Sequence, residues 1–169
     1  MIKIDLGCGT RQKEGFEGVD IIAFPGVVHV VDLREKWPWR DESVSEARCY
    51  HFIEHLEAHE RIHFANELHR VLTPGGICEV AVPHWASPRA YGDLTHRWPP
   101  VSEMWFFYLS RRWRAENAPH EIGYDCDFDL RFGYALNDQL QPMNDQQRTF
   151  ALQWYKQAAD DIVAWLTKR

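Results

Sequence analysis

The sequence predicts an α/β protein, a three-layer sandwich around a mostly parallel sheet. Two observations lead to this expectation. Short strand patterns recur through the first half of the chain, and a segment with the period of an amphipathic helix separates the last two of them. Because neighbouring parallel strands need crossover connections, usually helical ones, this alternation is typical of a parallel sheet.

Four short strands are expected in the first 50 residues. They are placed at residues 2–6, 18–22, 27–31 and 46–50. The third is nearly all apolar and β-branched, so we expect it to be covered on both faces. Only residues 7–17 separate the first two strands, a minimal length for a parallel crossover, so the first crossover helix is expected to be shortened or missing.

The next elements are a helix and a fifth strand. Residues 56–72 carry apolar side chains three and four positions apart, which predicts a helix with one buried face. That face would hold Ala58, Ile62, Ala65, Leu68 and Leu72. The sequence Thr-Pro-Gly-Gly at 73–76 ends the helix, and residues 77–82 form a fifth strand that Pro83 closes.

The second half of the chain has a different character. Residues 84–125 are rich in Trp, Tyr, Pro and Arg, and their periodicity is weak apart from a short helix expected at 102–109. We interpret 84–125 as a lid or substrate-shaping insertion after the fifth strand, within a single domain of residues 1–169. A late strand is expected at 127–134, and an amphipathic helix is expected from Asn144 through Ile162 and Trp165.

Composition excludes several classes of protein. The 169 residues carry a formal net charge of −6 and 45% hydrophobic residues, which is typical of a globular domain and favours neither nucleic acid nor an anionic membrane. No apolar run approaches the roughly 20 residues of a membrane span. The chain opens directly in a strand, so we expect no signal peptide. Its four scattered cysteines favour a reduced, cytoplasmic location.

A glycine loop and three acidic residues mark the expected ligand site. Asp5, Asp20 and Asp32 lie at or just past the ends of three successive strands, and Gly7 and Gly9 allow a sharp turn and close approach to a ligand. Ligands of open α/β sheets bind at this edge. A carboxylate after the second strand can accept both hydroxyls of a ribose, and one after the third can accept an exocyclic amine.

The main competing interpretation is a nicotinamide or flavin dinucleotide site in an oxidoreductase. Its fingerprint, G-x-G-x-x-G, requires a third glycine that permits close helix packing. The corresponding position is Gln12. The sequence therefore disfavours a dinucleotide pyrophosphate here.

Three motifs resemble those of class I S-adenosylmethionine-dependent methyltransferases, which have a Rossmann-like fold. The segment Asp5–Thr10 is similar to the first motif of that family. Residues 52–56 and 67–76 look like its segments after the fourth strand and before the fifth. The order and spacing hold from residue 2 to about 83, half of the chain. The segments 83–87 and 92–97 also resemble a compact subgroup of these enzymes.

The resemblance implies S-adenosylmethionine as cofactor and a role for each matching residue. Asp5 and the loop from Gly7 to Gly9 would hold its methionine end, Asp20 its ribose, and Asp32 its adenine. The full set of expected cofactor-binding residues is Asp5, Gly7, Cys8, Gly9, Arg11, Asp20, Ile21, Asp32, Leu33, Tyr50 and His51, of which the last two would border the methyl group. Arg11 is included because a missing first helix would offer less positive dipole to the cofactor carboxylate.

Histidines are the candidates for catalysis. His51, His84 and His96, with Asp93, form a possible cluster that acts as a base or orients the acceptor. His51, His55, His59 and His63 are spaced by four and suggest a metal stripe. However, the apolar face of that helix runs elsewhere, so His59 and His63 should face solvent, and we expect no metal site.

The function expected from the resemblance is transfer of a methyl group to an O, N or C nucleophile on a small or medium-sized acceptor. The alternative is a non-catalytic module that binds S-adenosylmethionine or S-adenosylhomocysteine. DNA amino-methyltransferases carry Asp/Asn-Pro-Pro-Tyr/Phe after the fourth strand, where this chain has Cys49–Phe52. We therefore expect a small-molecule acceptor, no duplex DNA clamp and no membrane partner. The sequence leaves the oligomeric state open.

Overall fold

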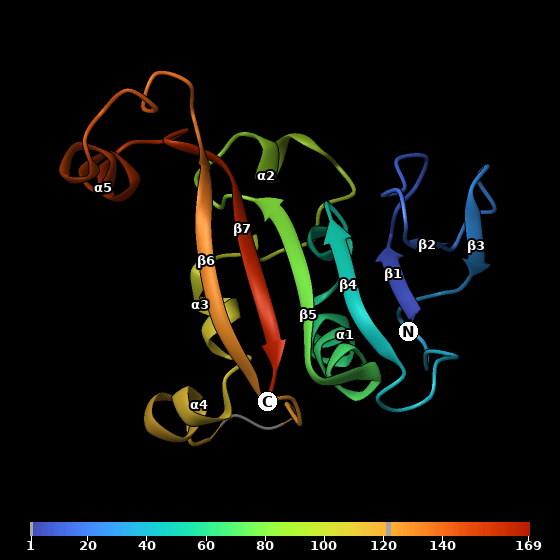
Figure 1. Cartoon of the computed structure of the whole chain (residues 1–169). Coiled ribbons are helices and arrows are strands. Elements are labelled where there is room, and N and C mark those ends of the chain that lie inside the picture. Colours follow the sequence, from blue (N-terminus) through green and yellow to red (C-terminus); the bar gives the residue numbers. More distant parts are fainter. Residues whose placement is uncertain (1, 121–122) are drawn as a thin grey trace.

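A computed structural model describes residues 2–120 and 123–169 of the chain, which fold around one seven-stranded sheet (Figure 1). The strand order is β3-β2-β1-β4-β5-β7-β6. The strands are β1 (Ile2–Leu6), β2 (Glu17–Asp20), β3 (Val27–Val30), β4 (Val44–Tyr50), β5 (Leu72–Pro83), β6 (Phe128–Leu136) and β7 (Ala159–Lys168). Strands β1 to β5 pair in parallel, and β7 runs antiparallel to both β5 and β6. The expected α/β class with a mostly parallel sheet is confirmed.

Helices occupy the second half of the chain more than the first. They are η1 (Ile53–His55), α1 (Ala58–Val71), α2 (Arg89–Gly92), α3 (Glu103–Phe107), α4 (Arg111–Asn117) and α5 (Asp145–Trp154). The short helix expected at 102–109 is α3. Helices α2 to α4 all fall in the insertion at 84–125, of which residues 121 and 122 lie outside the described residues. No described helix has the length and apolar character that a membrane crossing requires.

The core lies on one face of the sheet. In β4 the side chains of Ala47 and Cys49 are buried, whereas those of Arg48 and Tyr50 on the opposite face are half-buried. Phe64 of α1 and Phe106 of α3 belong to the same buried cluster as these inward strand residues. The strands therefore alternate between an apolar face that packs on helices and a polar face, as in a half-covered sheet.

The first crossover has no helix, as expected, and the second and third crossovers also lack one in the described chain. The sheet face opposite the core carries charged pairs, among them Lys3 with Glu46 at 2.5 Å and Arg48 with Asp5 at 3.1 Å. The three-layer arrangement is therefore reduced on this side, where ion pairs and cation–π contacts stand in place of an apolar helix layer.

The expectation for the third strand was wrong. Val28 and Val30 are 62% and 59% exposed, although the strand was expected to be covered on both faces. Strand β3 pairs only with β2, at the edge of the sheet, and the helices that would flank it are missing. Its β-branched residues report strand propensity rather than burial.

The C-terminal helix was also wrong in its second half. Helix α5 ends at Trp154, and Ala159–Lys168 forms β7, which lies between β5 and β6. Residues 162, 164 and 166 are buried with the strand period of two, which overlaps the helical spacing on which the expectation relied. Pairing on both edges of β7 decides between the two periods.

Helix α1 is present, but its buried face is turned from the expected one. Arg61, Phe64, Ala65, Leu68 and Val71 face the core. Ala58 is exposed and Ile62 half-buried, which corrects the expected face. The helix begins with a capping box in which Glu57 and Glu60 satisfy each other's backbone N–H groups.

Candidate functional site

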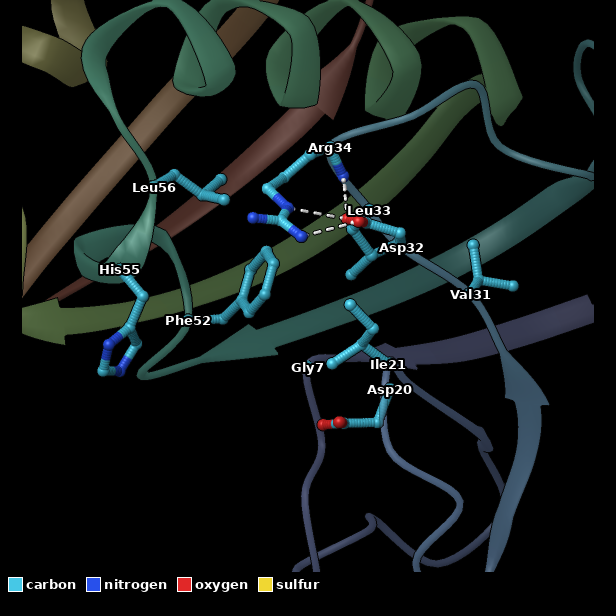
Figure 2. A pocket seen from close by; sticks show the side chains of 10 residues that line it. All are labelled: Gly7, Asp20, Ile21, Val31, Asp32, Leu33, Arg34, Phe52, His55 and Leu56. Atoms are coloured by element: carbon cyan, nitrogen blue, oxygen red, sulfur yellow. Dashed lines mark hydrogen bonds and ion pairs between the residues drawn. The ribbon is translucent and has the colours of Figure 1, made fainter. Parts of the chain in front are cut away.

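The strand order reverses at β1, whose neighbours are β2 and β4, and a cavity of about 230 Å³ lies at the carboxyl ends of these strands. Its walls come from the segments that follow β1, β2, β3 and β4 (Figure 2). The lining residues are Gly7, Asp20, Ile21, Val31, Asp32, Leu33, Arg34, Phe52, His55 and Leu56. A reversal point of this kind is where ligands of open α/β sheets bind.

The glycine loop is held by the carboxylate of Asp20. The Gly9 N–H donates to Asp20 Oδ2 at 2.9 Å, and the Ile22 N–H donates to Oδ1 at 3.0 Å. Gly7 and Gly9 have φ of 64° and 53°, which only glycine adopts without strain. A Cβ on Gly7 would lie 2.5 Å from the Phe52 ring, whereas one on Gly9 would enter open space. Gly9 therefore leaves open space beside the Asp20 carboxylate, which lines the cavity.

Gln12 stabilises the loop in place of a helix. Its side-chain Nε2 donates to the carbonyl oxygens of Gly9 and Pro25, each at 3.0 Å, and so ties the β1–β2 connection to the β2–β3 connection. A Cβ on Gly26 would lie 2.1 Å from Gln12 Oε1, so the absence of a side chain at Gly26 makes room for this amide. The residue that disfavours a dinucleotide site thus has a structural role of its own.

Asp32 lies in the cavity with its carboxylate held by Arg34. Arg34 Nε and Nη2 donate to Oδ1 and Oδ2 at 2.9 and 2.7 Å, and Figure 2 shows both contacts. The bidentate pair holds the pKa of Asp32 below its ordinary value. Arg34 is exposed, so the pair adds little to stability and its side chain is free to move when a ligand enters. Leu33 is buried beside it.

Six of the expected cofactor-binding residues do not line this cavity: Asp5, Cys8, Gly9, Arg11, Tyr50 and His51. Asp5 is 1% exposed and accepts hydrogen bonds from Lys13 N and Arg48 Nη1 at 2.7 and 3.1 Å, on the polar face of the sheet. Burial raises the pKa of Asp5, against the opposing effect of these donors. Tyr50 stacks under the Arg48 guanidinium on the same face, with 3.8 Å to the ring centroid. Cys8 is half-buried within the loop and Arg11 is exposed.

A second, larger cavity of about 650 Å³ adjoins the first, and His55 lines both. Its other lining residues are His51, Glu54, Pro83, Arg89, Gly92, Asp93, Leu94 and His96. They come from the end of β4, from η1, from the end of β5 and from the insertion. The structure thus brings together three of the four residues expected to act in catalysis, His51, Asp93 and His96.

His51 has an unusual backbone conformation at the mouth of this cavity. Its φ is 54°, a left-handed value that costs a non-glycine residue free energy and that clusters at functional sites. Its Nδ1 lies 3.4 Å from Glu54 Oε1, and its Nε2 lies 3.7 Å from Asp161 Oδ2. His51 therefore stands between the largely buried carboxyl groups of Glu54 and Asp161. Burial raises the pKa of Asp161.

His84 differs from the other histidine candidates because it does not open into the cavity. It is 2% exposed, its Nδ1 accepts from the Ala86 N–H at 3.1 Å, and its Nε2 lies 3.4 Å from Glu103 Oε1. Tyr134 and Trp85 also donate to Glu103, at 3.0 Å each. The chain turns inward directly after Pro83, so His84 fixes the start of the insertion to α3 and β6.

Three further polar residues of the site were not expected from the sequence. Arg34 lies two residues past Asp32, Glu54 lies within the recognisable 52–56 segment, and Arg89 opens the insertion. Glu54 is 4% exposed, and neither of its carboxylate oxygens has a hydrogen-bond partner among the described residues. In the sequence, the one feature that could have pointed to Glu54 is its neighbour His55, because a Glu-His pair after a strand end offers two atoms that can bind a ligand or a metal ion.

Comparison with protein families supports a specific assignment of the N-terminal half. Residues 11–80 match the model of a family described as a methyltransferase domain. No curated protein matches the chain at a significant level.

Solved structures similar to the whole chain are methyltransferases. A SAM-dependent methyltransferase from Archaeoglobus fulgidus has a TM-score of 0.69 and 17% identity over 98% of this chain and 85% of its own. Geranyl diphosphate C-methyltransferase from Streptomyces coelicolor A3(2), solved with S-adenosyl-L-homocysteine, gives 0.58 and 15% over 99% and 73%. The 1,6-didemethyltoxoflavin-N1-methyltransferase of Burkholderia thailandensis gives 0.61 and 12% over 99% and 70%. This chain therefore has the fold of the SAM-dependent methyltransferases.

Proposed function

We propose that this chain, whose residues 11–80 match a methyltransferase domain and which has the fold of the SAM-dependent methyltransferases, transfers a methyl group from S-adenosylmethionine to a small or medium-sized acceptor. One observation carries the proposal. The Asp20 carboxylate, anchored by the Gly9 N–H, lines a cavity at the strand-order reversal, and that cavity adjoins a second one rich in histidine. The first suits a nucleoside and the second an acceptor.

The residues of the first cavity fit the adenosine half of the cofactor. A carboxylate offers about four lone pairs, and two on Asp20 are taken by backbone N–H groups, so two remain for the ribose hydroxyls. Leu33 and Phe52 supply apolar walls for a base, and Asp32 can accept its amine once Arg34 moves aside. The open space above Gly9 is room that a ligand would fill.

Asp5 supports this site from below rather than touching the ligand. Its bond to Lys13 N fixes the far end of the glycine loop. Arg11 remains our candidate for the cofactor carboxylate, since no helix dipole serves that end in the described loop. Cys8 and Ile21 would contact the cofactor through backbone atoms. Tyr50 would influence the site indirectly, through its position at the end of β4. The bound cofactor would supply an electrophilic methyl group on a sulfonium.

The second cavity would receive the acceptor, under a lid formed by the insertion at 84–125. His51 lies at the end of β4, close to the position expected for the methyl group, and can accept a proton from the acceptor or orient it. Asp93 and His96 approach from the insertion, so closing the lid would complete the site. Arg89 adds a positive charge at the rim. The four cysteines are free, which supports a reducing, cytoplasmic location.

Calorimetric titration with S-adenosylmethionine, S-adenosylhomocysteine and NAD tests the proposal. We expect saturable binding of the first two and none of NAD. Asp20→Asn keeps the shape but removes the charge that strengthens hydrogen bonds, so affinity for S-adenosylhomocysteine should fall about tenfold or more. Glu14→Gln, which removes an exposed charge from the same loop, is the matched control and should bind normally. Tight NAD binding without a response to the other two would overturn the assignment.

The second candidate function is a non-catalytic module that binds the cofactor or its product. It shares the first cavity and differs only in turnover. A screen of metabolite acceptors with labelled S-adenosylmethionine separates the two, because methyl transfer to any compound eliminates the module. The strained His51 at the rim of the second cavity favours the enzyme, since such strain persists mainly where it serves a function.

A further inference from the structure

We propose that Glu54, His55 and His96 bind a divalent transition-metal ion in the larger cavity. One ligand atom from each of the three lies within 4.8 Å of the other two, and all three residues line that cavity. An ion at their centre would stand at most about 2.8 Å from each atom. Closing to the bond length of about 2.1 Å that Zn²⁺ makes with nitrogen and oxygen requires shifts of less than 1 Å.

The Glu54 carboxylate is the observation that points to a cation. It is 96% buried, and neither oxygen has a hydrogen-bond partner among the described residues. His51 Nδ1 lies 3.4 Å from Glu54 Oε1. A buried carboxylate without hydrogen bonds costs several kcal/mol unless a cation or donor compensates it. A metal ion would supply that compensation.

The hydrogen bonds of the two histidines engage Nδ1 of each ring and leave Nε2 free to bind a metal ion. Thr95 Oγ1 donates its single proton to Asp93 Oδ1 at 2.7 Å, so its 2.9 Å contact with His55 Nδ1 makes that nitrogen the donor. His96 Nδ1 lies 3.2 Å from the Ala90 carbonyl, which can only accept. Both rings are thereby fixed in the tautomer with a lone pair on Nε2. This is the arrangement in which metal-bound histidines are usually held.

A buried arginine holds the two parts of the set together. Glu54 and His55 lie on η1, and His96 lies about 40 residues later in the insertion. Arg61 of α1 donates to the carbonyl oxygens of Leu56 at 3.0 Å, of Arg97 at 3.2 Å and of Pro99 at 2.7 Å. The Arg97 N–H donates to the Glu54 carbonyl at 2.8 Å. The three side chains are therefore positioned before any ion binds.

Two imidazoles and one carboxylate select the class of ion. Zn²⁺, Fe²⁺, Mn²⁺ and Co²⁺ accept this set with further positions open, whereas Mg²⁺ and Ca²⁺ prefer oxygen ligands throughout. The open positions would face the cavity in which we place the acceptor. If the proposed function holds, the ion would bind an oxygen of the acceptor, which makes a hydroxyl-bearing compound the expected substrate class.

The test is titration of the metal-free, untagged chain with Co²⁺ and Zn²⁺. We expect one Co²⁺ per chain, with visible absorption bands that acetohydroxamate, a bidentate oxygen ligand, perturbs. Glu54→Gln and His96→Ala should each weaken binding by roughly tenfold or more, since even the loss of an outer-shell partner costs that much. His59→Ala removes an exposed histidine from α1 and should bind the ion normally. Mg²⁺ at the same concentration should give no saturable signal.

Separate measurements distinguish this inference from the proposed function. S-adenosylhomocysteine should bind wild type and His96→Ala equally, because His96 does not line the first cavity. Co²⁺ binding that is absent, or unchanged in both Glu54→Gln and His96→Ala, overturns the metal site whatever the cofactor does. If acetohydroxamate leaves the Co²⁺ spectrum unchanged, the bound ion has no coordination position open to the cavity, and that part of the proposal is wrong. Glu54→Gln removes a buried carboxylate that has no hydrogen-bond partner among the described residues, so the metal-free variant should melt no lower than wild type. A melting temperature in that range shows that misfolding is not the cause of lost binding.

Discussion

Gly9→Ala separates the folding of the glycine loop from its role in ligand binding. The Gly9 backbone has a φ of 53°, and an added Cβ meets nothing within 4 Å. Alanine there incurs only the left-handed penalty of about 1–2 kcal/mol. At about 2–4 °C per kcal/mol for a domain of this size, the melting temperature should fall by about 2–8 °C. The new methyl group, however, would occupy space that we assign to the cofactor.

The chain supplies a matched control for this variant in Gly15. Gly15 has a φ of 81° and equally open surroundings. Neither glycine lines the cavity, but the Gly9 N–H donates to the cavity-lining Asp20, whereas Gly15 lies at the other end of the β1–β2 connection, close to the start of β2. Gly15→Ala should therefore lose the same stability and keep its affinity. Calorimetry with S-adenosylhomocysteine should show at least a tenfold loss in Gly9→Ala, about 1.4 kcal/mol, and none in Gly15→Ala. Equal affinities of the two variants would refute the placement of the cofactor over the loop.

Three further variants test the packing around the site. Gln12→Ala removes two hydrogen bonds to carbonyls, so unfolding free energy should drop by about 1–3 kcal/mol in thermal denaturation. Gly7→Ala should destabilise more than Gly9→Ala, because its methyl group would lie 2.5 Å from Phe52. In Glu67→Gln the charged bonds to Arg70 weaken, which should cost about 1.5–3 kcal/mol at pH 7. Although burial opposes it, Arg70 holds the pKa of Glu67 below 4.5, so this difference should shrink as pH falls through that lowered pKa.

Each of these variants has its own contrary outcome. Gln146→Ala replaces an exposed glutamine of α5 and controls for the loss of a side-chain amide. If Gln12→Ala and Gln146→Ala melt at the same temperature, Gln12 does not stabilise the loop. If Gly7→Ala has the same melting temperature as Gly9→Ala, Phe52 moves away from the new methyl group at no cost in free energy. For Glu67→Gln, urea titrations at several pH values give the stability difference. A difference that stays constant below pH 4.5 would contradict the lowered pKa.

The chemistry of the first cavity was readable from the sequence because its residues follow the ends of successive strands. Chain order alone places Gly7, Asp20 and Asp32 at one edge of a parallel sheet. The resemblance then supplied the cofactor. The sequence could not show to which side of the sheet each side chain points. Asp5 and Tyr50 also lie at the carboxyl ends of their strands, but their side chains point to the polar face of the sheet, away from the cavity.

The strand β7 shows the limit of local patterns. Residues 159–168 satisfy both a helical and a strand spacing, and only the two free edges of β5 and β6 select the strand. The same holds for β3, where apolar residues are exposed because neighbouring helices are missing. In both segments non-local neighbours decide between states that the local sequence allows.

The sequence by itself determined the parallel half of the sheet, the glycine loop and the acidic residues after the strands, because each depends on local period and chain order. Only the tertiary structure decided which histidines lie together. His84 turns inward to Glu103, whereas Glu54, His55 and His96 converge although about 40 residues separate them. Arg61 brings these segments together through backbone carbonyls, a contact that leaves no pattern in the sequence.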